Sequence, residues 1–364
     1  MLWQSYLRFG LFFLALNAAL SDWAAFSAST SLRDEMVAKA KKEGEVVFMG
    51  DVATELKTLL KGFFKRYPFI QLKGIEARSG DTINRVAAET KAGRLSVDVS
   101  GMSLDRVVPL ERQNLLAKFD SPHLRDFPPW SQPSSKLYAV GQSNPLPQGV
   151  VNTNLVPPAE MPKSWNEMLD PKWKGKTIVS RSRSDIPAQV AWLFRKGDQL
   201  NWERSFEIFT RIKQLDPILG DTGINAHVAR VAAGEFSLFW FPASGSVLRL
   251  QLKGAPVRLI AFPKMFTDYR VWMIFNGAPH PAAAWLLVDY FLSPEGQFEL
   301  SDTVDGILPL NTKAAPGKLA KMLIDQGFVP ENLDLSGPEK LLEIFSEEVA
   351  KKSDNFYFNA MGYK

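Results

Sequence analysis

A short loop near the middle of the chain carries side chains well suited to hold an anion. It runs from Ser180 to Asp185, directly after an apolar run that predicts a strand. Its members Arg181 and Arg183 can each grip a carboxylate or a phosphate with two parallel hydrogen bonds, and Ser182 adds a hydroxyl donor between them. We therefore predict that this loop binds an anionic ligand. The alternative is a solvated surface turn with no ligand.

Small and polar residues also follow the first three predicted strands. The candidates are Asp51 after the first strand, Ser79, Gly80 and Thr82 after the second, and Ser100 and Met102 after the third. The second group begins a predicted helix, where free backbone amides can bind an anion. The alternative there is that Ser79 or Asp81 only caps the helix.

Two later loops add four further candidates. Asp221 and Thr222 precede a predicted helix, so they either line a ligand site or only cap that helix. Trp240 and Phe241 end a predicted strand, and an aromatic ring there can stack on a planar ligand. We expect Trp240 to lie in the core and Phe241 to face the ligand, with Ser244 beside it.

Nothing in the sequence predicts catalysis, a metal site or a cofactor. The chain has no cysteine, which excludes disulfides, thiolate metal ligands, a cysteine nucleophile and a lipid-modified cysteine. His123, His227 and His280 are far apart in the sequence, and we expect each to be structural. There is neither a GxxxxGK phosphate loop nor a GxSxG nucleophile motif. We therefore predict a binding protein rather than an enzyme.

The N-terminal residues 1–28 have the composition of a secretion signal. Arg8 precedes two apolar runs that are too short to span a bilayer, and small residues follow. Residues 27–29 and 19–21 each offer a cleavage pattern. The alternative is a membrane anchor. We expect export to the periplasm as a free, monomeric protein.

The rest of the chain has the composition of a globular protein. It has 364 residues, of which 46% are hydrophobic and 23% charged, enough for one large or two medium domains. The net charge is +4, with no long basic block, so we expect no binding to nucleic acid.

Strands and helices alternate in two series along the chain. The first series contains the predicted strands 46–49, 70–75 and 97–99 with helices between them, which predicts parallel pairing. A proline-rich tract then covers residues 121–162, where a domain crossing is expected. The second series begins with strand 177–179. Each series therefore predicts one α/β lobe.

The segment Ser164–Lys176, SWNEMLDPKWKGK, has a readable local structure. Ser164 is suited to cap a short helix, and Asp170 and Pro171 end it. As a string, the segment resembles the start of the second lobe in periplasmic solute-binding proteins of the ferric-iron, thiamine and organophosphate transporter group. Further strings resemble the same family in the same order: AKKEGEVVF at 40–48, RSGDTINRVAAETKAGRLSVDVSGMS at 78–103, NTNLVPP at 152–158, AAGEFSLFW at 232–240, KGAPV at 253–257, GAPHPAAAWLLVDYFLSPEGQ at 277–297 and ILPLN at 307–311.

The resemblance implies a two-lobed α/β fold of the type II periplasmic binding protein class, each lobe a mainly parallel sheet flanked by helices, with hinge strands between. The implied lobes are residues 31–141 plus 264–335 and residues 142–263, followed by a C-terminal helix and tail at 336–364. The family traps a solute between the lobes and presents it to the permease of an ABC transporter. Ligands of such sheets lie beyond the carboxyl ends of the strands.

The family's ferric-binding members use a histidine, a glutamate and two adjacent tyrosines as metal ligands. The matching positions here are Asp51 or Val52, residues 100–102, and Phe241 with Pro242, so all the ligands are missing. We therefore expect a small organic anion as the solute. One alternative is a ferric receptor with displaced donors, Tyr138 and Tyr269 with Asp51. Others are a secreted two-lobed enzyme and a sensor that delivers the closed form to a receptor kinase.

Overall fold

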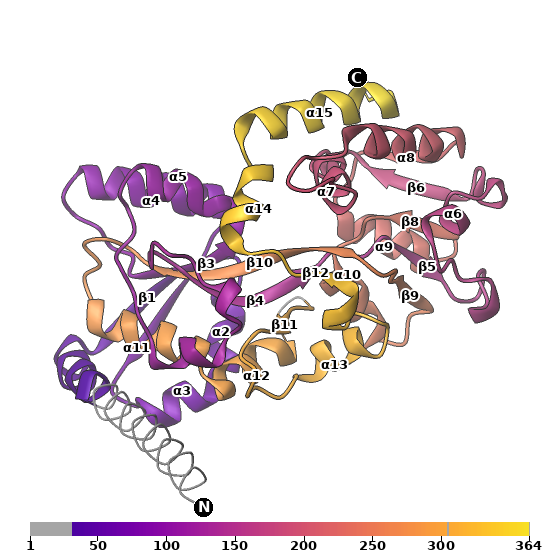
Figure 1. Ribbon diagram of the computed structural model, residues 1–364. Helices are drawn as coiled ribbons and strands as arrows, with labels where there is room; N and C mark the ends of the chain where they lie inside the picture. Colours follow the sequence, from indigo (N-terminus) through magenta and orange to yellow (C-terminus); the bar gives the residue numbers. More distant parts are fainter. Residues whose placement is uncertain (1–30, 304–305, 364) are drawn as a thin grey trace, which may run out of the picture.

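The computed structural model describes residues 31–303 and 306–363. The predicted secretion signal, residues 1–28, lies outside the described residues. Within these ranges the chain forms two α/β lobes, each built on its own sheet, and Figure 1 shows β4 and β10 running between the two halves of the molecule. No described helix is long and apolar enough to cross a membrane.

The sheet of lobe one has the order β11-β4-β10-β3-β1-β2, and β12 pairs with β10. Its strands are β1 (Glu45–Gly50), β2 (Gln71–Glu76), β3 (Val99–Ser103), β4 (Ala139–Pro145), β10 (Met265–Ile274), β11 (Leu308–Pro309) and β12 (Leu333–Asp334). β1 pairs in parallel with β2 and β3, as the alternation of strands and helices predicts. β10 runs antiparallel to both β3 and β4.

The sheet of lobe two has the order β7-β6-β8-β5-β9. Its strands are β5 (Gly149–Asn152), β6 (Thr177–Ser180), β7 (Ile218–Gly220), β8 (Leu238–Trp240) and β9 (Val257–Ile260). β6 is parallel to β7 and β8, whereas β5 is antiparallel to β8 and β9. Both sheets are therefore mixed rather than mainly parallel, because the strands next to the lobe crossings reverse direction.

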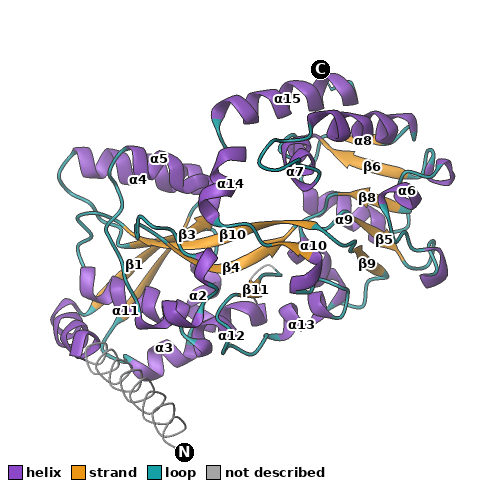
Figure 2. Ribbon diagram, in the orientation of Figure 1, coloured by secondary structure: helices purple, strands orange, loops and turns teal. Residues whose placement is uncertain are grey.

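Helices cover both sheets, as Figure 2 shows by colour. Residues 31–43 are helical, and the helices that follow are α2 (Ala53–Leu59), α3 (Lys61–Arg66), α4 (Ser79–Lys91), α5 (Val107–Arg112), α6 (Trp165–Met168), α7 (Ile186–Leu193), α8 (Trp202–Gln214), α9 (Ile224–Ala232), α10 (Ser244–Gln251), α11 (Pro281–Leu292), α12 (Pro294–Thr303), α13 (Lys318–Ile324), α14 (Pro338–Ile344) and α15 (Glu347–Met361). The predicted cap of α6 is confirmed, since the Ser164 hydroxyl accepts the Glu167 amide at 3.3 Å.

Three apolar clusters hold the lobes together, and some of their members come from both lobes. In lobe one, Phe48, Trp272 and Phe291 pack together, with ring centroids of Trp272 and Phe291 4.2 Å apart. In lobe two, one cluster contains Ile208 and Phe209 of α8, and another contains Val247 and Leu248 of α10. Burial of such side chains contributes roughly 1.5–3 kcal/mol each. The core therefore fixes the ends of the strands from which the loops project.

Two late segments connect the lobes in ways that the sequence does not indicate. Helix α13, which the sequence places with lobe one, shares a cluster with Val247, Leu248 and Leu259 of lobe two. The single late helix predicted from Pro338 divides at Phe345 and Ser346 into α14 and α15, and the predicted tail continues α15. Helix α15 packs on α7 and α8 of lobe two.

Candidate ligand-binding cleft

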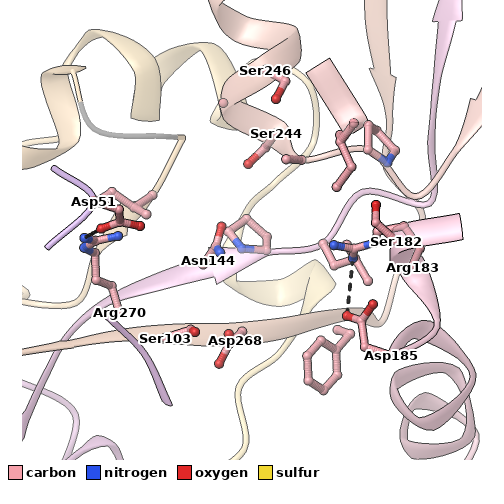
Figure 3. A pocket seen from close by; sticks show the side chains of 18 of the residues that line it. Asp51, Ser103, Asn144, Ser182, Arg183, Asp185, Ser244, Ser246, Asp268 and Arg270 are labelled. Atoms are coloured by element: carbon pink, nitrogen blue, oxygen red, sulfur yellow. Dashed lines mark hydrogen bonds and ion pairs between the residues drawn. The ribbon is translucent and has the colours of Figure 1, made fainter. Parts of the chain in front are cut away.

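A cavity of about 560 Å³ lies between the lobes and is lined by both. Lobe one contributes Asp51 after β1, Ser79 at the start of α4 and Ser103 at the end of β3. Lobe two contributes the loop after β6 and the first residues of α9 and α10. Figure 3 shows these side chains converging from both sides, with β4 and β10 forming the floor. The cleft thus lies at the carboxyl ends of parallel strands, where ligands of such sheets are expected.

The loop after β6 forms a short 3-10 helix, Arg181–Arg183, at the wall of lobe two. The Ser180 hydroxyl accepts the Ser182 amide at 3.3 Å and is 2.9 Å from the Ser182 hydroxyl. Arg183 points into the cleft with only 16% of its side chain exposed, and its terminal nitrogen is 3.8 Å from an Asp185 oxygen. Its buried Nε hydrogen-bonds to no described residue. The guanidinium as a whole lines the cavity, so its other N–H groups are the ones placed to meet a ligand acceptor.

Two helices begin at the same wall. The N-cap positions of α9 and α10 are Gly223 and Ala243, and neither provides a side-chain cap. The first residues of both helices line the cavity. Amide groups in a first helical turn have no partner within the helix and carry partial positive charge. The wall of lobe two therefore presents Arg183 together with two sets of amide donors.

The wall of lobe one also contains an arginine, but it is neutralised. Arg270 of β10 donates to Asp51 at 2.6 Å and to the Gly101 carbonyl at 3.2 Å. Its guanidinium lies over the Trp272 ring, 5.3 Å from the centroid. Its side chain is 11% exposed, whereas that of Asp51 is 49% exposed. The pair leaves this wall polar with little net charge.

Asp268 lies between Phe266 and Arg270 on the floor of the cleft. Burial raises the pKa of its carboxyl to about 8, and the nearby Asp105 carboxylate acts in the same direction. The Tyr269 amide donates to one of its oxygens at 2.7 Å, which opposes the increase. At neutral pH the group is therefore mainly a neutral acid. Besides Asp268, the cavity is lined by three arginines, Arg183, Arg249 and Arg270, and by two aspartates, Asp51 and Asp185, so the cleft favours an anion.

Five residues predicted from sequence line the cavity: Asp51, Ser79, Ser182, Arg183 and Ser244. Gly80 does not, although it is adjacent to Ser79. Thr82 and Ser100 are fully buried and bond to backbone carbonyls, Thr82 to Arg78 at 3.2 Å and Ser100 to Met49 at 2.7 Å. Met102 lies in the core of lobe one. These three side chains stabilise the fold of lobe one and do not line the cleft.

The other predicted residues of lobe two face away from the cavity. Arg181 lies over the rings of Phe358 and Tyr363 and is 3.9 Å from Asp221. The Thr222 hydroxyl is 3.3 Å from Nδ1 of His227.

Phe241 was expected at the ligand, but its ring packs in the core against Phe209 and Trp165. Its backbone has φ 56, a left-handed conformation that redirects the chain as the strand ends. Trp240 is in the core, as predicted.

Several lining residues were not predicted from sequence, namely Asn144, Asp185, Gln189, Arg249, Asp268 and Arg270. Asp268 and Arg270 lie in β10, the first half of which the sequence did not identify as a strand. Both are partly exposed, and they alternate with the buried Thr267, Tyr269 and Val271. This alternation of period two is the signal that could have placed them on one face of a strand.

No group of three or more histidine, cysteine or acidic residues suited to a metal ion occurs among residues 31–303 and 306–363. Of the displaced ferric donors, Asp51 and Tyr269 line the cleft, but the three do not come together. Tyr138 lines a different cavity, and the Tyr269 hydroxyl donates to the Ser336 carbonyl at 2.5 Å. The histidines are structural, as expected: His280, for example, is 2.9 Å from the buried Asp98. None of the three lines the cleft.

Two lobes on separate sheets, joined by crossing strands around a polar cleft, define a binding protein that encloses a small solute. The chain belongs to the bacterial extracellular solute-binding protein family, whose model matches residues 58–325. It is thus a solute-binding protein, from a family of binding proteins rather than enzymes.

Solved structures show the same fold. The periplasmic binding protein AfuA from Actinobacillus pleuropneumoniae, with fructose-6-phosphate bound, is 20% identical with a TM-score of 0.65, covering 88% of this chain and 99% of that one. The Trichodesmium protein IdiA (FutA), with iron and citrate, is 16% identical with a TM-score of 0.70 over 88% and 100%. Iron-bound HitA from Pseudomonas aeruginosa is 17% identical with a TM-score of 0.65 over 87% and 99%. No curated protein sequence matched the chain.

Proposed function

We propose that the solute is a small organic anion bearing a carboxylate or a phosphate, which the protein captures in the periplasm and delivers unchanged to an ABC permease. In this account the protein acts as a monomer and performs no chemistry on the solute. Family membership alone does not specify the ligand, its unchanged release to a permease, the compartment or the oligomeric state.

The observation that carries the proposal is the set of donors that lines the wall of lobe two. Arg183 lines the cavity, and its carboxylate neighbour Asp185 is 3.8 Å away, beyond hydrogen-bond distance. The uncapped starts of α9 and α10 line the same cavity. Hydrogen bonds between a guanidinium and an anion are about twice as strong as neutral ones, and helix N-termini favour negative charge. An anionic group satisfies all these donors together.

Two proteins of the same fold hold anionic ligands, which supports an anionic ligand here. The Actinobacillus protein holds a sugar phosphate, and the Trichodesmium protein holds citrate together with iron. In this chain only two of the three donors named for iron, Asp51 and Tyr269, line the cleft. Tyr138 lies in another cavity, and the Tyr269 hydroxyl already donates to the Ser336 carbonyl. The organic anion is therefore the better match to the cleft than a ferric ion.

A ligand panel tests the proposal. Purified protein is heated in the presence of citrate, inorganic phosphate and hexose phosphates, with the uncharged hexoses as matched controls. A ligand at a hundredfold excess over its dissociation constant stabilises the folded state by about 2.7 kcal/mol, which raises the melting temperature. We expect at least one anion, and no uncharged hexose, to do so. Recovery of the bound compound unchanged supports a receptor, whereas conversion to a product contradicts it. If no anion raises the melting temperature, the anion proposal fails.

A further inference from the structure

The C-terminal helix α15 packs against the back of the loop that carries Ser182 and Arg183. The Tyr357 hydroxyl donates to the Ser180 carbonyl at 2.6 Å. The Ser353 hydroxyl donates to the Ser184 carbonyl at 2.7 Å and accepts the Ala188 amide at 3.1 Å. The two carbonyls lie on either side of Arg183 in the sequence. The helix therefore fixes both ends of the segment that faces the solute.

The loop cannot supply these contacts itself. Its 3-10 helix has only three residues, and the loop's own side-chain bonds run between Ser180 and Ser182. Ser180 and Ser353 are both buried, so water does not readily replace a lost bond. A buried carbonyl without a partner is costly, which makes the hydroxyls of α15 the means by which this loop conformation is held.

The helix is itself firmly placed. Ser353, Tyr357 and Met361 recur at four-residue spacing and form its buried face. Phe356 stacks on Phe206 of α8 with ring centroids 3.7 Å apart. Burial raises the pKa of Tyr357 well above its usual range, so its hydroxyl keeps its proton and remains a donor. The orientation of these groups is therefore set before any solute arrives.

The segment that leads into α15 contacts both lobes. The Ser134 amide and hydroxyl in lobe one donate to Glu339 of α14 at 2.9 and 2.6 Å. Lys340 of α14 donates to Asp198 in lobe two at 2.9 Å. Arg195 of lobe two pairs with Asp334 of β12, which belongs to the sheet of lobe one. Figure 1 shows α14 and α15 continuing from the middle of the molecule along lobe two.

We infer that Ser353 and Tyr357 are positioning residues of the solute site, which orient Arg183 for the ligand from a helix that does not itself line the cleft. This inference rests on the proposed anion site for its effect on affinity. Its structural part, the control of the loop conformation, can be measured without a ligand.

Hydrogen exchange of the full-length protein without ligand tests the structural part. The variants are Tyr357→Phe and Ser353→Ala, and the control is Phe356→Leu, which weakens the packing of the same helix on α8 without touching the loop. Loss of one hydrogen bond speeds local opening about fivefold. We expect exchange in residues 180–188 to be about fivefold faster in Tyr357→Phe, which loses one bond, faster still in Ser353→Ala, which loses two, and unchanged in the control. If the loop exchanges at the wild-type rate in both variants, the inference is overturned.

A double-mutant cycle with citrate tests the functional part. Tyr357→Phe should weaken citrate binding about fivefold in the wild-type background and have no effect in an Arg183→Gln background, because the orientation of Arg183 then no longer matters. Phe356→Leu should leave the affinity unchanged. An equal loss in both backgrounds means that Tyr357 acts only through stability and overturns the inference. If the wild-type protein binds no anion, the proposed function fails, while the exchange measurement still decides the inference.

Discussion

The two walls of the cleft both present an arginine, but the partners of those arginines differ. Arg270 in lobe one donates to Asp51 at 2.6 Å, whereas Arg183 in lobe two is 3.8 Å from its carboxylate neighbour Asp185. The buried Nε of each arginine has no partner among the described residues. Lobe two adds the uncapped starts of α9 and α10. We therefore expect the same residue type to bind the charge of the solute on one wall and to form a neutral polar surface on the other. The neighbours of an arginine decide its role.

The comparison predicts that removal of Arg183, which has no carboxylate as close as the partner of Arg270, has the largest effect. Arg183→Gln should weaken binding of the anion found in the panel by about tenfold to a hundredfold, since a charge-assisted bond contributes about 1.5–3 kcal/mol. Isothermal titration measures the loss. Arg181→Gln is the matched control, because it removes the same charge from the same loop but outside the cleft. Equal losses in the two variants would mean that net charge, and not the position of Arg183, governs binding.

Second, we predict that Asp268 makes the stability of the folded protein depend on pH. The unfolded chain ionises this group near roughly pH 4, whereas the folded protein retains the proton up to about pH 8. Stability therefore falls as pH rises between these values, because the folded state binds the additional proton. Since Asp268 is partly accessible to solvent, we expect a loss of about 1–3 kcal/mol.

Urea unfolding of the wild type and of Asp268→Asn between about pH 5 and about pH 8 measures this loss. The asparagine variant should lose less stability over that range. The ionised carboxylate should also repel an anion, so citrate affinity should fall from about pH 7 to about pH 9 in the wild type only. A variant with the wild-type pH profile would show that Asp268 is already ionised at neutral pH.

Third, we predict that the stability of lobe two can be lowered without a change in its affinity for anions. Ser164→Ala removes the cap of α6, a helix that does not line the cleft. We expect a loss of about 1 kcal/mol in the free energy of unfolding and no change in the affinity for anions. Chemical denaturation and titration check the two parts. A weaker affinity would mean that binding follows the overall stability of lobe two.

The smallest expected effect is on the neutral wall. Asp51→Asn removes the partner of Arg270 and leaves that guanidinium available to the ligand. Because Asp51 is half exposed, we expect a gain in anion affinity of only about twofold to fivefold. Titration at low and high salt detects it. A weaker affinity would show that Asp51 itself accepts a hydrogen bond from the solute.

The sequence predicts the features of this molecule that depend on residues close together in the chain. Strand ends and helix starts are local features, so Asp51, Ser79, Ser182, Arg183 and Ser244 could be placed at the cleft from patterns in the chain. The cap at Ser164 is equally local. The two-lobed arrangement was predictable from the two series of strands and the many strings that resemble one family.

Long-range packing explains what the sequence did not predict. Phe241 lies at a strand end like the other candidates, but its left-handed backbone and the neighbouring Phe209 place its ring in the core. Arg270 reaches the cleft only because β10 crosses between β3 and β4. The role of α15 depends on contacts such as that of Tyr357 with Ser180, which are 177 residues apart in the chain. No local pattern contains that information.

A crystal structure of the protein with the anion selected by the panel tests the central claim most directly. The account predicts the charged group of the ligand within hydrogen-bond distance of the Arg183 guanidinium and of the first amides of α9 and α10, with the Asp51 and Arg270 pair facing the rest of the molecule. A ligand whose charged group lies instead against Arg270 and makes no hydrogen bond to Arg183 would contradict it.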